Sequence, residues 1–200
     1  MKNADIDLSG TRIETFRLLV RPFEMGDLND FYEYAKVPGV GEGAGWLPHQ
    51  SKEETKKVLQ MFIAGKKTLA IYHKDDHKVI GSIGLEPFAG DIAGYPANWL
   101  GREVGFALSK AYWGHGLMTE AMTSLIPNCF ALLGLDFISL GHWVGDDRAA
   151  RVAIKCGFRH VEQRFFTTSA GDERLCDYYV LLNPRLGYVI DDKGKLKKKR

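Results

Sequence analysis

The chain has 200 residues, 45% of them hydrophobic, which is enough to bury a sizeable core within one domain. Its formal net charge of +2 is too small to indicate a nucleic-acid binder that works by bulk electrostatics. No secretory signal follows Met1, no apolar run approaches the ~20 residues of a membrane helix, and the 3 separated cysteines suit neither a disulfide framework nor a zinc site. We therefore expect a soluble cytoplasmic protein that binds no metal, membrane or nucleic acid, with the basic stretch Lys195–Arg200 as a solvated tail.

Apolar periodicity, interrupted by glycine and proline, divides the chain into regular elements. In chain order we expect a strand at 16–22, helices at 27–36 and 51–66, strands at 69–72, 79–85 and 102–108, a helix from 116 to about 134, a strand at 137–144, a helix at 147–156, and strands at 161–168 and 174–182. Hairpins combined with a strand–helix–strand crossover predict a mixed α/β fold with one sheet.

The same patterning sets the domain boundaries. Residues 1–10 are polar and are expected to be flexible, and the compact domain is expected to span 11–183. Residues 184–200 form a C-terminal extension, in which 188–198 has the pattern of a small hairpin. No linker is long enough to separate a second domain.

Local signals predict where the helices begin and end. Ser51 followed by Glu54 is a capping box, and Asp146 is a suitable N-cap for the last helix. Pro127 falls inside the third helix, which it should bend or interrupt, and Gly134 is a natural stop.

Three aromatic residues in loops are candidates for a substrate pocket. Trp46 lies in the glycine-rich loop 39–49, where it either fixes the loop to the core or lines the pocket. Tyr95 and Trp99 lie in the loop just before the strand at 102–108, which would let them overhang the same cavity. The three rings would form an aromatic rim that suits an uncharged or cationic amine.

The stretch Glu103–Ala121 carries the strongest functional signal. It begins as a strand, passes through a loop with Gly114 and Gly116 one residue apart, and opens into an amphipathic helix. This geometry aims unpaired backbone N–H groups and the positive end of a helix dipole at one point, where a phosphate can bind. The two glycines permit backbone angles that side chains disfavour and let an anion come close. Glu103, at the start of the stretch, is a candidate proton acceptor.

These features resemble the GNAT acetyltransferase superfamily, and within it the RimJ/RimL-like branch. The segments that carry the resemblance are Glu103–Phe106 as the acid-bearing strand, Tyr112–Ala121 as the pyrophosphate loop, Arg151–Phe158 as a late helix ending in Gly-Phe, and Trp46–Thr55. The resemblance covers about 12–183. It implies a GNAT-like domain with a mostly antiparallel twisted sheet of about seven strands, flanked by four helices.

The resemblance also implies the chemistry. Acetyl-CoA would donate an acetyl group to a primary amine, either a protein N-terminus of the ribosomal-protein type or a small amine, by direct attack in a ternary complex. Glu103 would accept the proton of the amine, directly or through water. The positions implied for cofactor binding are Phe106, Ala107, Leu108, Tyr112, Trp113, Gly114, His115, Gly116, Leu117, Met118, Thr119, Asp146, Arg148 and Lys155.

The sequence departs from the family pattern at four positions, one of which is Asp146, where RimL-like members often have asparagine. Ala111 stands where glutamine or arginine is usual, so phosphate contact would rest on backbone groups and Lys110. Ala153 and Ala149 stand where many members have tyrosine and serine, so the sequence names no general acid. These replacements favour a second reading, in which the fold binds CoA as a sensor or scaffold without turnover.

The sequence leaves two roles open for Glu103. It acts as the base, or it is a structural carboxylate paired with Arg102, Lys110 or another cation. The identity of the amine acceptor and the choice between monomer and homodimer are not set by the sequence.

Overall fold

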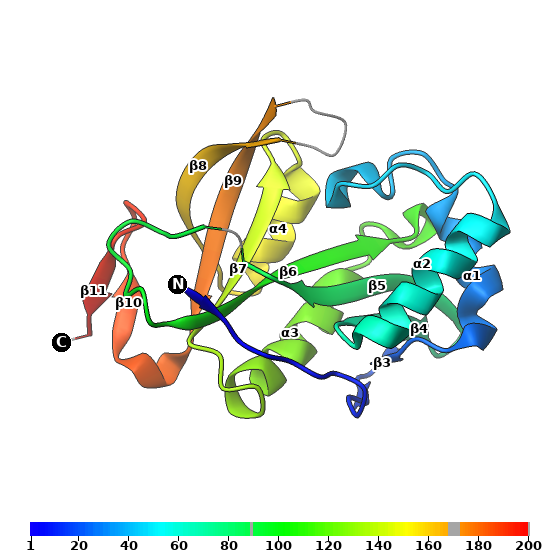
Figure 1. Ribbon diagram of the computed structural model, residues 1–200, viewed down its shortest axis with the longest axis horizontal. Helices are drawn as coiled ribbons and strands as arrows, with labels where there is room; N and C mark the ends of the chain where they lie inside the picture. The colour runs from blue at the N-terminus through cyan, green and yellow to red at the C-terminus, as the bar shows by residue number, and fades with distance from the viewer. Residues whose placement is uncertain (89, 168–172, 200) are drawn as a thin grey trace. The chain divides into compact units, whose positions relative to one another are not determined.

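The computed structural model of the protein describes residues 1–88, 90–167 and 173–199. The chain divides into two compact units. Unit 1 comprises Met1–Asp5, Glu86–Val104 and Ile126–Arg200, and unit 2 comprises Ile6–Leu85 and Gly105–Leu125. Strand β6 (Leu100–Leu108) begins in unit 1 and continues into unit 2, whereas helix α3 (Leu117–Ala131) begins in unit 2 and continues into unit 1 (Figure 1).

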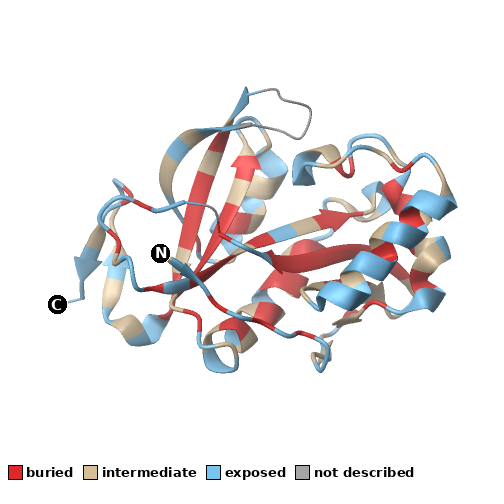
Figure 2. Ribbon diagram, viewed as in Figure 1, coloured by how far each residue is buried: buried red, intermediate tan, exposed pale blue. Residues whose placement is uncertain are grey.

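Unit 2 is built on an antiparallel sheet with two helices packed on it. The strands pair in the order β2 (Ile13–Glu14), β3 (Leu18–Pro22), β4 (Thr68–His73) and β5 (Lys78–Glu86). The helices are α1 (Leu28–Ala35) and α2 (Lys52–Gly65). Figure 2 shows β5 in red along most of its length, because nearly all of its residues are buried. The core cluster joins helices to strands through Phe31, Tyr34, Leu59, Ala70, Val79 and Ala107.

Capping and a buried ion pair hold the two helices of unit 2 in place. The Ser51 hydroxyl accepts the Glu54 amide at 3.1 Å, which confirms the predicted N-cap of α2. Before α1, the Arg21 guanidinium forms a two-bonded pair with the Asp27 carboxylate at 2.7 and 2.8 Å. Asp27 also accepts the Glu24 amide at 2.8 Å, so the chain enters α1 through a fully bonded carboxylate.

Unit 1 contains both parallel and antiparallel pairs. The start of β6 pairs in parallel with β7 (Phe137–Trp143), and β7 is followed in the sheet by β9 (Glu173–Leu182) and β8 (Arg159–Thr167), both antiparallel to their neighbours. The parallel ladder covers Gly101–Glu103 of β6. Helix α4 (Asp147–Lys155) begins at Asp146, whose carboxylate accepts the amides of Arg148 and Ala149, as the sequence predicts.

The expected strands and helices are all present, as β3 to β9 and α1 to α4, and the mixed, mostly antiparallel fold is confirmed. Within the described ranges the sheet has nine strands instead of about seven, because β1 (Lys2–Asn3) and β2, each of two residues, add to it. The C-terminal hairpin also forms, as β10 (Tyr188–Ile190) and β11 (Leu196–Lys198). The segment 169–173, between the expected strands at 161–168 and 174–182, lies mostly outside the described residues.

Two further expectations concern the N-terminus and the third helix. Residues 1–10 were expected to be flexible, but β1 pairs with β6 in unit 1, and Leu8 in unit 2 is buried and donates its amide to Lys66 at 2.8 Å. Pro127 was expected to bend or interrupt the third helix; α3 runs through it to Ala131, so the helix is not interrupted there. The buried side chains on both sides of the proline, Leu125 and Cys129, offset the one backbone bond that it removes. In the described part of the chain no helix has the length and apolar character to cross a membrane.

Candidate active site

The turn from β6 into α3 has the geometry that its glycines predict. A short 3-10 helix at Lys110–Tyr112 ends β6, and the Trp113 indole donates to the Leu108 carbonyl at 2.7 Å, which ties the loop to the strand. Gly114 and Gly116 have φ of +80° and +77°, in the left-handed region that L side chains disfavour. The first intrahelical bond then runs from the Glu120 amide to the Gly116 carbonyl at 3.0 Å.

The amides of this turn are available to an outside acceptor. In the residues that the structure describes, none of the five amides from Gly114 to Met118 donates to a protein acceptor. They lie at the first turn of α3, where helix geometry leaves N–H groups unbonded and places a positive partial charge. Such a cluster binds phosphate groups.

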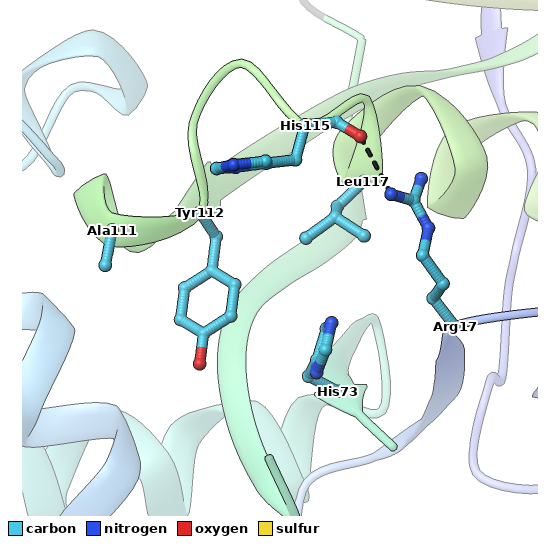
Figure 3. Close-up of a pocket in the computed structure, with 6 residues that line it drawn as sticks. All are labelled: Arg17, His73, Ala111, Tyr112, His115 and Leu117. Carbon is cyan, nitrogen blue, oxygen red and sulfur yellow. Dashed lines mark hydrogen bonds between the residues drawn. The ribbon is translucent and has the colours of Figure 1, made fainter. Parts of the chain in front are cut away.

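A cavity of about 240 Å³ adjoins the loop within unit 2. Its lining residues, drawn in Figure 3, are Arg17, His73, Ala111, Tyr112, His115 and Leu117. The Tyr112 hydroxyl donates to the Asp76 carboxylate, and burial together with that carboxylate raises the pKa of Tyr112 to about 12. The phenol therefore keeps its proton at neutral pH and holds the loop to the β4–β5 turn.

Glu103, in unit 1, belongs to a group of polar side chains on one face of the sheet. A Cβ placed on Gly141 of β7 would lie 3.0 Å from the Tyr178 ring and 3.4 Å from Glu103 Oε1, so both side chains converge on this glycine. The Arg164 guanidinium lies 3.8 Å from the centre of the Tyr178 ring and 5.5 Å from that of Phe88. Strands β6, β9 and β8, with β7 between the first two, thus bring a carboxylate, a phenol and a cation together.

The electrostatics of this group favour a carboxylate that takes up a proton readily. Burial raises the pKa of Glu103, and the opposing charge of Arg164 does not cancel the effect, to which Glu86 adds. Arg102, an expected partner of Glu103, instead directs its guanidinium to the Ala4 carbonyl, with Nε at 2.8 Å. Burial, followed by the charge of Glu103, raises the pKa of Cys176 to about 11, so this thiol is not an activated nucleophile.

Comparison with known proteins decides the family. A family profile described as "Acetyltransferase (GNAT) domain" matches residues 17–159. The chain belongs to the GNAT acetyltransferase family. A relative from Bacillus subtilis (strain 168), the uncharacterized N-acetyltransferase YoaA, is 23% identical over 152 residues, covering 74% of this chain and 82% of the relative.

Solved structures show the same GNAT fold at low sequence identity. The ribosomal-protein-S5-alanine acetyltransferase from Vibrio fischeri superposes with a TM-score of 0.65 at 20% identity, covering 87% of this chain and 97% of that one. The microcin C7 self-immunity acetyltransferase MccE, solved in complex with acetyl-CoA and AMP, gives a TM-score of 0.68 at 15% identity, covering 84% and 94%. At these identities the likeness establishes the fold and leaves the acceptor open.

The positions that the GNAT resemblance implies for the cofactor belong partly to unit 2 and partly to unit 1. Phe106, Ala107 and Leu108 lie on β6 beyond its parallel ladder with β7, in unit 2 with the loop. The remaining loop positions are Tyr112, Trp113, Gly114, His115, Gly116, Leu117, Met118 and Thr119. Asp146, Arg148 and Lys155 belong to unit 1, at the two ends of α4.

Two of the three charged positions implied for the cofactor, Asp146 and Arg148, already contact neighbouring groups. The carboxylate of Asp146 caps the N-terminus of α4. Arg148 Nε lies 3.5 Å from Asp146 Oδ1. Lys155 is exposed in the last turn of α4. Lys110, the side chain expected to assist the loop, lies 5.6 Å above the Trp113 ring. These positions leave the backbone of the loop as its main anion-binding feature.

The three aromatic candidates for the substrate pocket differ in how far their side chains are buried. Tyr95 and Trp99 are only 8% exposed each and belong to the core cluster of unit 1, so the structure does not place them on an open rim. Trp46 is half-buried against the core cluster of unit 2, where its ring leaves no space for a Cβ on Gly41. Trp46 is therefore the aromatic candidate that retains exposed surface.

Sequence reasoning missed Arg17, Arg164 and Tyr178. Each lies on or beside a strand of mixed pattern, far in sequence from the residues it contacts, and no local motif marks it. β8 carries several other polar residues besides Arg164, so the charge of Arg164 gave no signal that sets it apart.

Proposed function

We propose that the protein is an acetyl-CoA-dependent N-acetyltransferase that acts on a primary amine. The observation that carries the proposal is the turn at Gly114–Met118, where two left-handed glycines present a row of amides that have no acceptor among the residues described, at the start of α3. Membership of the GNAT family supports the same reaction. The acetyl-CoA bound by MccE supports the choice of cofactor.

The residues of the loop fit a diphosphate. The amides of Gly114 to Met118 would donate to its oxygens, and the dipole of α3 would stabilise its charge. The backbone of Phe106–Leu108, beyond the β6–β7 ladder, would bond to the amide groups of the pantetheine arm. When bound, acetyl-CoA supplies an activated acetyl thioester. The chain itself positions both reactants, which is a large part of the acceleration in a two-substrate transfer.

Glu103 is the proposed proton acceptor. An amine attacks only when it is neutral, so a base must remove its proton at neutral pH. Burial raises the pKa of Glu103, which makes the carboxylate a stronger base at the working pH. The charge of Arg164 opposes this shift and favours the ionised carboxylate, which is the form that accepts a proton. We assign no side chain to protonation of the departing thiolate, for which water suffices.

The proposed acceptor is a protein N-terminus of the RimJ/RimL type or a small amine. The ribosomal-protein-S5-alanine acetyltransferase among the structural neighbours supports the first choice. Trp46, with its exposed edge, would contribute an aromatic wall to the acceptor pocket.

The test is release of CoA from acetyl-CoA in the presence of a panel of amines: peptides with N-terminal alanine or serine, a polyamine and an aromatic amine. We expect saturable turnover with at least one amine, and a much lower kcat in Glu103→Gln with unchanged CoA affinity. Glu53→Gln, at an exposed position in α2, serves as the control. CoA binding without turnover on any amine would favour the sensor or scaffold, and absence of CoA binding would refute the proposal.

A further inference from the structure

Arg17 reaches the proposed diphosphate loop from the turn that precedes β3 and contacts it twice. Its Nη1 donates to the His115 carbonyl at 2.9 Å, inside the loop (Figure 3). Its Nε and Nη2 both lie close to Glu120 Oε2, at 2.8 and 2.7 Å. A guanidinium has a fixed fork of donors, so it can hold a carbonyl and a carboxylate in a set relative geometry.

Glu120 is bonded from the same segment on its other oxygen. The Thr15 hydroxyl donates to Glu120 Oε1 at 2.6 Å, and the Arg17 amide donates to it at 2.9 Å. Burial by itself raises the pKa of Glu120, but the bonds from Thr15 and Arg17 outweigh it and lower the pKa. Glu120 is thus an ionised carboxylate in the first turn of α3, and its oxygens bond to Thr15 and Arg17.

The position of this carboxylate matters for an anion site. A first-turn glutamate ordinarily stabilises the positive end of its own helix, and there it would compete with a bound diphosphate. Pairing with Arg17 neutralises that charge and leaves the amides of Gly114 to Met118 without a protein acceptor among the described residues. At the same time the bond to His115 fixes the loop between the two left-handed glycines.

We infer that the Arg17–Glu120 pair, with Thr15, is a latch that positions the loop for the diphosphate and removes a competing charge from it. The inference rests on the proposed function, because it assigns Arg17 and Glu120 as positioning residues of that same anion site. It is local to unit 2, and neither side chain needs to touch the cofactor.

The first arm of the test measures affinity and kinetics. Arg17→Met should weaken CoA binding at least tenfold in a calorimeter and raise the KM for acetyl-CoA, with little change for S-acetylpantetheine, which lacks the diphosphate. Arg17→Lys should recover part of the loss. Glu120→Gln should cost far less than Arg17→Met, and the double variant should bind CoA more tightly than Arg17→Met because the unpaired carboxylate is gone.

The matched control is Lys74→Met, which removes the exposed ion pair between Lys74 of the β4–β5 turn and Glu14 of β2 without removing a side-chain contact to the loop. It should leave CoA affinity within twofold of the wild type. Equal losses for acetyl-CoA and S-acetylpantetheine in Arg17→Met would reveal a general structural role and overturn the latch, as would unchanged CoA affinity.

The second arm uses the ligand-free protein. Hydrogen exchange in a peptide covering 117–125 should accelerate in Arg17→Met, since the first turn of α3 loses its anchor, and should not change in Lys74→Met. Unaltered exchange would overturn the latch even if CoA binds. A wild-type protein that fails to bind CoA would refute the proposed function, while accelerated exchange would still show that Arg17 anchors the helix start.

Discussion

Replacing Gly114 with alanine should weaken CoA binding without unfolding the protein. A Cβ on Gly114 would meet no atom within 4 Å, so the cost is conformational: φ is +80°, and the left-handed region costs an L residue about 1–2 kcal/mol. Among the described residues the amides of Gly114 to Met118 have no acceptor, so a change of angle at Gly114 breaks none of their bonds, and the short segment between the anchors at Trp113 and His115 can adjust in the free protein. The cost then falls on binding, where it corresponds to about a 5- to 30-fold loss of affinity.

Calorimetric titration of CoA into wild type and variant measures this loss directly. The matched control is Gly187→Ala, which has φ of +70° and equally open space but lies in the C-terminal extension. The control should lower the melting temperature by about 2–8 °C while leaving CoA affinity unchanged. Gly114→Pro, whose ring excludes positive φ and lacks the N–H, should abolish binding in a folded protein. Equal affinities for wild type and Gly114→Ala would refute the role of the loop.

Three further predictions test the rest of the molecule. Glu103→Gln should reduce kcat about 100-fold or more and remove the acidic limb of the kcat/KM profile, because only the ionised carboxylate accepts a proton. Since burial raises the pKa of Glu103, its ionisation destabilises the fold as pH rises, so Glu103→Gln should melt higher than the wild type at pH 8, and equal melting would contradict this. Asp27→Asn should cost about 3–5 kcal/mol in urea unfolding because it strands the buried Arg21 charge, and a change below about 1 kcal/mol would show that the pair contributes little. Trp46→Ala should destabilise by about 1–2 kcal/mol and raise the KM for the amine but not for acetyl-CoA, whereas an unaffected amine KM would make Trp46 a packing residue only.

Local signals in the sequence were sufficient for the main elements. Ser51 and Asp146 cap α2 and α4 as predicted, because a side-chain oxygen at a helix start satisfies the amides beside it wherever the helix packs. The turn at Gly114 and Gly116 could also be predicted from the sequence. Both residues have positive φ, which glycine adopts more easily than any other residue.

Features that depend on distant partners could not be predicted in this way. Residues 1–10 are polar in composition, yet β1 adds to β6, and that pairing has no local signature. Pro127 carries a strong signal to interrupt a helix, but burial on both sides of it outweighs one lost backbone bond. Arg17 and Glu120 are 103 residues apart, so the sequence around either residue does not predict that they form a pair.

The placement of Tyr95 and Trp99 illustrates the same limit for the site. Large aromatics in a loop suit either a pocket rim or a core, and only the three-dimensional packing separates the two. In the structure both rings lie in the core cluster of unit 1 with Phe88 and Phe137. Glu103 was found from its strand position, whereas its neighbour Arg164 on β8 required the sheet order β7, β9, β8.

A crystal structure of the protein grown with CoA tests the central claim most directly. The account predicts that oxygen atoms of the diphosphate lie within hydrogen-bond distance, about 2.7–3.2 Å, of backbone nitrogens between Gly114 and Met118. A diphosphate bound elsewhere, with those amides facing solvent or another part of the chain, would contradict it.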